Sequence, residues 1–129
     1  MKNKKVLVVD DEPEILELLK NRLEQHQFEV ITVSDANLAI EKLQEVIPDL
    51  FILDILMPSF WGIDKYGASL CEVLKTQDEY KSIPIIVISA LGRNLTPVIE
   101  EMIKQADAYF PKPFQAEVLI KKANELVSK

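Results

Sequence analysis

Five residues with side chains suited to phosphoryl chemistry stand at the ends of short apolar runs: Asp10, Asp11, Asp54, Ser89 and Lys112. Crowded carboxylates repel one another, and a hard divalent cation relieves that repulsion by taking their oxygens as ligands. An aspartate carboxylate can act as a nucleophile, while an ammonium and a hydroxyl can donate to transferred phosphoryl oxygens. The set therefore predicts phosphoryl transfer to Asp54, assisted by magnesium, Lys112 and Ser89.

Each of these residues also has a purely structural explanation when it is taken alone. Asp11 or Glu12 could cap a helix that starts at Pro13, because first-turn amides and the helix dipole favour acids there. Asp54 could be a turn residue, and Lys112 could be a solvated surface charge. Their joint placement favours the functional interpretation.

Short runs rich in apolar residues predict five strands, and the continuous apolar runs Val6–Val9 and Ile85–Ile88 suit strands buried on both faces of a sheet. The five predicted strands cover Val6–Val9, Phe28–Val33, Leu50–Leu53, Ile85–Ile88 and Asp107–Phe110. Strands that alternate with helices indicate a doubly wound parallel α/β sheet with right-handed crossovers. Ligands bind such sheets at the carboxyl ends of the strands, where the five residues are expected to meet.

Helical spacing of apolar residues predicts five helices between and after these strands. Pro13 suits the first turn of the first helix, and either Ser34 or Asp35 is the N-cap of the second. A third helix is expected around Leu70, Val73 and Leu74. Thr96-Pro97 predicts the start of the fourth helix, and Leu119, Ala123 and Leu126 mark the last.

Length and composition predict one domain spanning residues 1–129, with about 4–128 structured. No apolar run is long enough to cross a bilayer, and acidic residues interrupt the N-terminal region before a secretory signal could develop. A single cysteine, Cys71, fits a reducing cytoplasm. The net charge of −6 disfavours direct nucleic-acid binding.

Four motifs occur in order along the chain: Val-Leu-Val-Val-Asp-Asp-Glu-Pro, Leu-Asp-Ile-Leu-Met-Pro, Val-Ile-Ser-Ala and Lys-Pro-Phe. With them the chain resembles the CheY-like receiver domains of two-component response regulators. That resemblance implies a flavodoxin-like strand order 2-1-3-4-5 and a phosphoacceptor at Asp54. It implies a signalling protein rather than an enzyme, with only magnesium-dependent self-phosphorylation and slow self-dephosphorylation.

The resemblance also assigns roles to individual residues. The metal, Mg²⁺ with Mn²⁺ as an alternative, would be held by Asp10, Asp11, Asp54 and the Leu56 carbonyl. Ser89 and Lys112 would act beside the acceptor, and the Lys112-Pro113 peptide bond would be cis. Ser89 and Tyr109 match the switch positions, and the alternative for Tyr109 is a packing aromatic on a strand. The pocket-flanking positions are Met57, Pro58, Ala90, Leu91 and Pro113.

Partners are implied in the same way. A sensor histidine kinase or a histidine phosphotransfer protein would supply the phosphoryl group. A downstream protein would bind the face formed by the fourth helix, fifth strand and fifth helix, with Lys104, Tyr109 and Lys121 as candidates. The protein would be a monomer or a switch-dependent dimer, either a stand-alone receiver without an output domain or an excised part of a longer regulator.

The stretch from 59 to 67 looks about five residues longer than the family pattern. It is either a tolerated surface insertion or a specificity loop in which Phe60, Trp61 and Tyr66 cover the pocket or contact a partner. The apolar residues Leu56, Ala90 and Leu91 suggest slow hydrolysis of the aspartyl phosphate.

Two other functions remain as alternatives. A magnesium phosphatase of the haloacid dehalogenase type needs acids two positions apart followed by a threonine, and Asp10 and Glu12 lack that threonine. A pseudo-receiver would keep the fold and bind partners without phosphorylation, but the complete acidic, hydroxyl and lysine set disfavours it.

Overall fold

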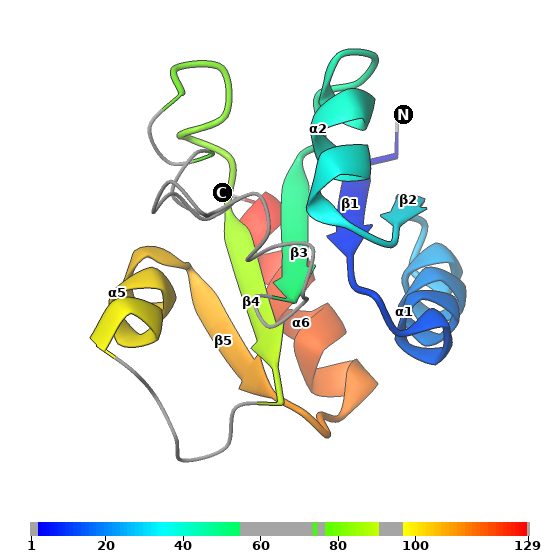
Figure 1. Ribbon diagram of the computed structural model, residues 1–129. Coiled ribbons are helices and arrows are strands. Elements are labelled where there is room, and N and C mark those ends of the chain that lie inside the picture. Colours follow the sequence, from blue (N-terminus) through cyan, green and yellow to red (C-terminus); the bar gives the residue numbers. More distant parts are fainter. Residues whose placement is uncertain (1–2, 55–73, 75–76, 91–96, 129) are drawn as a thin grey trace.

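A computed structural model describes residues 3–54, 74, 77–90 and 97–128. Its centre is a five-stranded parallel sheet with strand order β2-β1-β3-β4-β5 (Figure 1). The strands are β1 (Lys5–Val9), β2 (Glu29–Val33), β3 (Leu50–Asp54), β4 (Ile85–Ser89) and β5 (Ala108–Pro111). This is the predicted sheet and order, and no strand boundary differs from the predicted one by more than one residue.

Four helices lie within the described residues: α1 (Pro13–Gln25), α2 (Ala36–Leu43), α5 (Pro97–Gln105) and α6 (Ala116–Val127). The helix expected around Leu70, Val73 and Leu74 lies outside the described residues except for Leu74, which is helical and buried. None of the described helices is long and apolar enough to cross a membrane.

The sheet separates two apolar layers because successive strand residues point to opposite faces. Leu7 and Phe51 pack with α2 residues such as Ala39 on one face. Val8 and Ile52 belong to the other layer, which also holds buried residues of α1 and α6. Burial on both sides explains why the central strands are continuous apolar runs.

Local signals determine where the helices begin. Asp35, rather than Ser34, is the N-cap of α2, and its Oδ1 accepts a hydrogen bond of 2.8 Å from the Leu38 amide. Pro13 occupies the start of α1, as predicted. Pro97 is the first residue of α5, whereas the expected cap Thr96 lies outside the described residues.

Two aspartates form paired hydrogen bonds with neighbouring strands at the amino-terminal ends of the strands, which we call the amino-terminal edge of the sheet. Asp49 donates its amide to Lys5 O at 2.7 Å, and its Oδ2 accepts from Lys5 N at 2.8 Å. Asp107 makes the same pair of bonds with Ile85, each 2.8 Å long. These bonds satisfy backbone groups at the starts of β1 and β4 and fix the strands at this edge.

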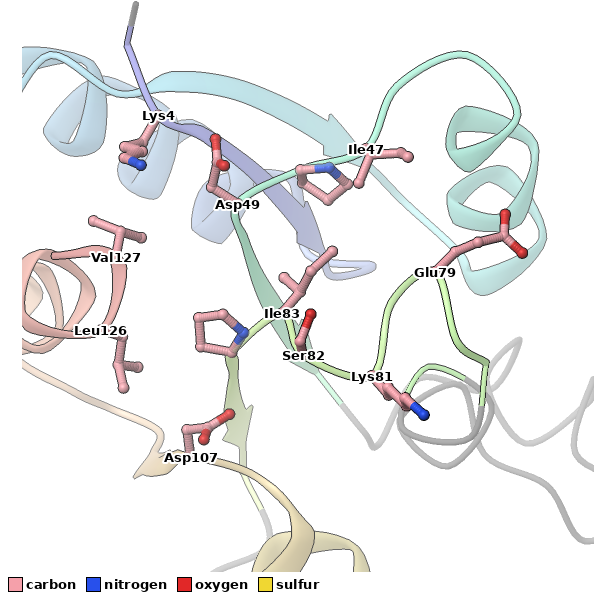
Figure 2. Close-up of a pocket in the computed structure, with 12 residues that line it drawn as sticks. Lys4, Ile47, Asp49, Glu79, Lys81, Ser82, Ile83, Asp107, Leu126 and Val127 are labelled. Atoms are coloured by element: carbon pink, nitrogen blue, oxygen red, sulfur yellow. The ribbon is translucent and has the colours of Figure 1, made fainter. Parts of the chain in front are cut away.

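A pocket of about 620 Å³ opens at the same edge (Figure 2). Asp49 and Asp107 line it together with Lys4, residues 81–84 and Leu126 near the end of α6. Because Asp54 ends β3, the pocket and the predicted acceptor lie at opposite edges of the sheet. The pocket is therefore separate from the candidate site.

Candidate functional site

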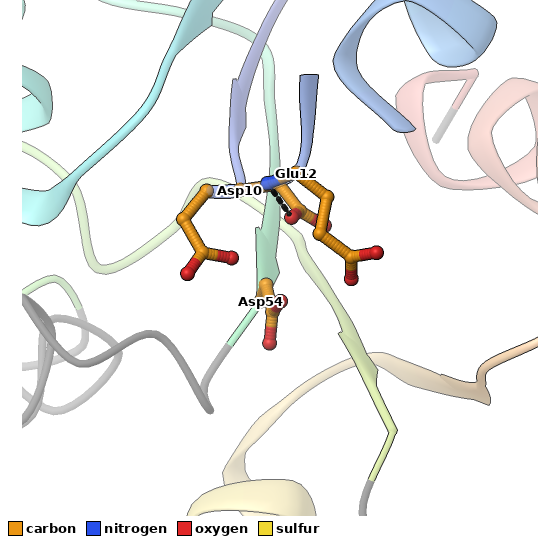
Figure 3. Close-up of side chains that lie close together, drawn as sticks. Asp10, Glu12 and Asp54 are labelled. Carbon is orange, nitrogen blue, oxygen red and sulfur yellow. Dashed lines mark hydrogen bonds between the residues drawn. The ribbon is translucent and has the colours of Figure 1, made fainter. Parts of the chain in front are cut away.

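The carboxyl ends of the strands bring the predicted residues together. Asp10 directly follows β1, Asp54 is the last residue of β3, and Lys112 directly follows β5. Figure 3 shows the side chains of Asp10, Glu12 and Asp54 gathered at the ends of β1 and β3. Because β1 lies between β2 and β3, the site is beside the point where the strand order reverses.

The Lys112 ammonium is the centre of this cluster. Lys112 Nζ donates to Glu12 Oε1 at 2.6 Å and to Asp54 Oδ2 at 2.9 Å. It also lies 2.9 Å from Asp10 Oδ2. Burial alone lowers the pKa of Lys112, but the bonds to Asp54, Glu12 and Asp10 outweigh burial and raise the pKa above its ordinary value. Lys112 is a fixed cation in this site.

Asp10 is fully buried, and its two oxygens have different surroundings. Oδ1 accepts a 2.8 Å hydrogen bond from the Glu12 amide, while Oδ2 forms the ion pair with Lys112 without hydrogen-bond alignment. Burial raises the pKa of Asp10 from 3.8 to about 6, more than the Glu12 amide and Lys112 lower it, and the Asp54 charge adds to the increase. Within the described residues, the carboxylates of this cluster therefore outnumber the single lysine that contacts them.

The donor set fits a hard divalent cation. Carboxylate oxygens of Asp10, Asp11, Glu12 and Asp54 all lie within 4.8 Å of one another. Oxygen ligands of this kind suit Mg²⁺, and Asp10 Oδ2 has no aligned hydrogen-bond donor among the described residues. The remaining predicted ligand, the Leu56 carbonyl, lies outside the described residues.

The other predicted site residues lie at different depths around this cluster. Ser89 ends β4 and is fully buried, and its carbonyl accepts a 2.7 Å hydrogen bond from the Lys112 amide. Ala90 and Pro113 are exposed, and the Lys112-Pro113 bond is cis, as the resemblance implies. Met57, Pro58, Leu91 and the 59–67 stretch lie outside the described residues.

Tyr109 is half-buried in β5 and packs against the apolar layer that contains Val87. Its hydroxyl is buried and has no hydrogen-bond partner among the described residues. Burial raises the pKa of Tyr109 above its ordinary value. This packing agrees with the structural interpretation of Tyr109, and its role as a switch stays a prediction.

Glu12 is the site residue that sequence reasoning did not assign. The sequence pattern indicates for Glu12 only a possible helix cap or one acid of a phosphatase motif. Glu12 does occupy the N-cap of α1, yet its side chain accepts no capping bond from the described helix amides and contacts Lys112 instead. The available signal was Pro13, which places the preceding residue at the helix entrance beside the two aspartates.

Comparison with known proteins identifies the family. The family model for the response regulator receiver domain matches residues 6–124. The chain belongs to this family, whose members are signalling phosphoacceptors that bind Mg²⁺ at an acidic pocket and interact with histidine kinases and downstream effectors.

Curated relatives are longer than this chain. The alkaline phosphatase synthesis transcriptional regulatory protein PhoP of Bacillus subtilis is 38% identical over 112 residues, which are 87% of this chain and 43% of PhoP. The transcriptional regulatory protein CpxR of Escherichia coli K12 is 37% identical over 116 residues, 90% of this chain and 46% of CpxR. The chain spans about half the length of such relatives.

Solved structures of similar length share the fold. The receiver domain of the Francisella response regulator 1452 has a TM-score of 0.80 and 31% identity, covering 98% of both chains. The chemotaxis response regulator CheY4 of Vibrio cholerae has a TM-score of 0.79 and 28% identity, covering 96% of this chain and 98% of CheY4. Both likenesses extend over nearly the entire chain.

Proposed function

We propose that Asp54 is a phosphoacceptor that receives a phosphoryl group from a histidine kinase or a histidine phosphotransfer protein. The observation that carries this proposal is the 2.9 Å contact between Lys112 Nζ and Asp54 Oδ2 inside a buried acidic cluster. Among the described residues, three carboxylates contact this single ammonium and Asp11 adds a fourth acid to the cluster, so carboxylates are in excess over lysine there. That excess suits a site that recruits a divalent cation together with a phosphoryl group.

The residues have separate tasks in the transfer. A carboxylate oxygen of Asp54 attacks phosphorus, forming a new P–O bond as the P–N bond of the donor phosphohistidine breaks. The departing imidazole nitrogen takes up a proton. Lys112 neutralises charge on the transferred oxygens, and the Ser89 hydroxyl donates a hydrogen bond to one of them.

Asp10, Asp11 and Asp54 would hold the metal, together with the Leu56 carbonyl. Mg²⁺, or Mn²⁺ on the same oxygen donors, would supply positive charge against the phosphoryl oxygens. Without a bound cation, Asp10 and Asp54 repel an anionic donor. The buried, incompletely hydrogen-bonded Oδ2 of Asp10 supports this assignment.

Phosphorylation would then change a protein-binding surface. Ser89 would move toward the phosphoryl group and Tyr109 would turn inward, altering the face formed by α5, β5 and α6 that a downstream protein binds. The same change would control whether the protein is a monomer or a dimer. Apolar residues at positions 56, 90 and 91 support a slow return to the unphosphorylated state.

The test is to incubate the protein with acetyl phosphate and Mg²⁺ and to measure its intact mass. We expect the wild type and the exposed-site control Asp78→Asn to gain one phosphoryl group, and Asp54→Asn to gain none. Label retained in Asp54→Asn would refute the assignment. No gain in the wild type would favour a pseudo-receiver, and continuous phosphate release from simple esters would favour a phosphatase.

A further inference from the structure

Glu12 is joined to Lys112 across the site but is placed differently from the other two carboxylates. The Glu12 side chain is 49% exposed, whereas those of Asp10 and Asp54 are 0% and 6% exposed. Its contact with Lys112 Nζ, at 2.6 Å, is the shortest of the three. The carboxylate therefore reaches into the site from solvent instead of being enclosed there.

The helix does not require this side chain. Glu12 is the N-cap of α1, and the amides of Ile15 and Leu16 bond to its backbone carbonyl at 3.1 and 3.2 Å. The Glu12 carboxylate makes no capping bond within the described part of the chain. Its position is thus explained by the lysine and not by helix capping.

Lys112 has as many carboxylate contacts as it has hydrogen atoms to donate. An ammonium group carries three N–H donors. In the described residues, Glu12, Asp54 and Asp10 all lie within 2.9 Å of Nζ. The contacts with Glu12 and Asp54 are hydrogen bonds, and a phosphoryl group on Asp54 adds oxygens that compete with all three carboxylates for the same ammonium.

The surroundings indicate which partner leaves. Asp54 would carry the phosphoryl group, and Asp10 is buried and held through Oδ1 by the Glu12 amide. Glu12 is half-exposed, so its carboxylate regains water when the contact with Lys112 breaks. Of the three carboxylates, that of Glu12 is the least costly to release.

We propose that Glu12 is a positioning residue that holds the Lys112 ammonium in the resting protein and yields it to the phosphoryl oxygens on Asp54. This role of Glu12 rests on the proposed function of Asp54. It makes Glu12 a residue that limits the rate at which Asp54 is phosphorylated. Breaking the Glu12–Lys112 contact becomes part of the barrier to phosphorylation. The same contact competes with the phosphoryl oxygens for Lys112 after transfer.

The experiment compares Glu12→Gln and Glu12→Asp with the wild type and with Glu14→Gln. Gln removes the charge and keeps the length of the side chain, while Asp keeps the charge and shortens the reach to Lys112. Glu14 is an exposed acid in the first turn of the same helix and lies outside the cluster, so it is the matched control. Rates of phosphorylation by acetyl phosphate are measured at saturating Mg²⁺, and Mg²⁺ affinity is measured separately by calorimetry.

We expect Glu12→Gln to be phosphorylated about 3- to 10-fold faster than the wild type, since a hydrogen bond to a charged group of this strength must otherwise be exchanged. Glu12→Asp should also be faster, and Glu14→Gln should be unchanged. Wild-type rates in both Glu12 variants would overturn the inference. Acceleration in Glu12→Gln alone would also overturn it, because it would show general charge repulsion of the donor.

A second measurement does not depend on phosphorylation. The ¹⁵Nζ resonance of Lys112 in metal-free protein should shift in both Glu12 variants and stay in place in Glu14→Gln. An unchanged resonance would overturn the proposed contact. If the wild type is phosphorylated but the Glu12 variants behave like it, only this inference fails; if the wild type accepts no phosphoryl group, the proposed function fails with it.

Discussion

Lys112 Nζ lies 2.9 Å from Asp54 Oδ2, although 58 positions separate the two residues in the sequence. The contact exists because β3 and β5 end at the same edge of the sheet, with β4 between them. Asp10 joins from β1, so that one ammonium faces two buried carboxylates and one exposed carboxylate. The balance of charge in this group leads to several measurable consequences.

Removing the lysine should destabilise the metal-free protein. Lys112→Ala removes the ammonium that contacts the buried carboxylates of Asp10 and Asp54, and we expect the free energy of unfolding to fall by about 3 kcal/mol at pH 7. Urea denaturation in EDTA measures this change. Lys121→Ala removes an exposed lysine of α6 and should stay within about 0.5 kcal/mol of the wild type. Equal effects of the two substitutions would contradict the central role of Lys112.

Asp10 should make the metal-free protein less stable as pH rises. Its pKa is about 6 in the folded protein and 3.8 ordinarily, so the folded state binds more protons between these values. The resulting loss of unfolding free energy is absent below about pH 4 and complete above about pH 6. The pKa difference corresponds to a loss of about 3 kcal/mol. Asp10→Asn removes it while keeping an oxygen for the Glu12 amide.

Urea denaturation of Asp10→Asn and the wild type across pH 4 to 7, in EDTA, tests this directly. The variant should gain stability relative to the wild type as the pH rises, and the difference should level off above about pH 6. A difference between the two proteins that does not change with pH would show that Asp10 is not the responsible group.

The hydrogen bonds between Asp107 and Ile85, at the amino-terminal edge of the sheet, should contribute to protein stability without affecting phosphorylation of Asp54. Asp107→Ala leaves the Ile85 amide without its 2.8 Å side-chain acceptor, which should cost about 1 to 3 kcal/mol. Asp78 pairs only with Lys81 within the described residues and its side chain is 92% exposed, so Asp78→Ala should be nearly neutral. Loss of phosphoryl acceptance in correctly folded Asp107→Ala would contradict the separation of the two edges.

The Tyr109 hydroxyl should not stabilise the unphosphorylated protein. It is buried without a hydrogen-bond partner among the described residues, so Tyr109→Phe should leave the free energy of unfolding unchanged or raise it by up to about 1 kcal/mol. Chemical denaturation measures this effect, with Tyr109→Ala as the comparison that also removes the ring. A loss above about 1 kcal/mol in Tyr109→Phe would mean that the hydroxyl has a partner.

The fold could be predicted from the sequence because local and global preferences agree. Runs such as Ile85–Ile88 are apolar at every position, which suits strands buried on both faces. Strand ends are less predictable: the sequence pattern places Asp107 in the last strand, but its side chain bonds to Ile85 and β5 begins at Ala108. The choice between Ser34 and Asp35 as N-cap also needed the structure.

Part of the candidate site could be predicted for a different reason. Asp10 and Lys112 directly follow strands and Asp54 ends one, and parallel strands end together, so their proximity follows from topology. The contact of Glu12 with Lys112 could not be predicted in this way, because nothing near Glu12 in the sequence specifies where its side chain points. That direction depends on a lysine 100 positions away.

The same 100-residue separation affects when the site comes into existence during protein synthesis. A ribosome-bound chain that ends before Lys112 lacks the ammonium that contacts both Asp10 and Asp54. Contacts so distant in sequence form late, after the intervening loop has been closed. Acquisition of the complete acceptor site therefore coincides with docking of the final strand, and a shorter nascent chain presents these carboxylates without Lys112.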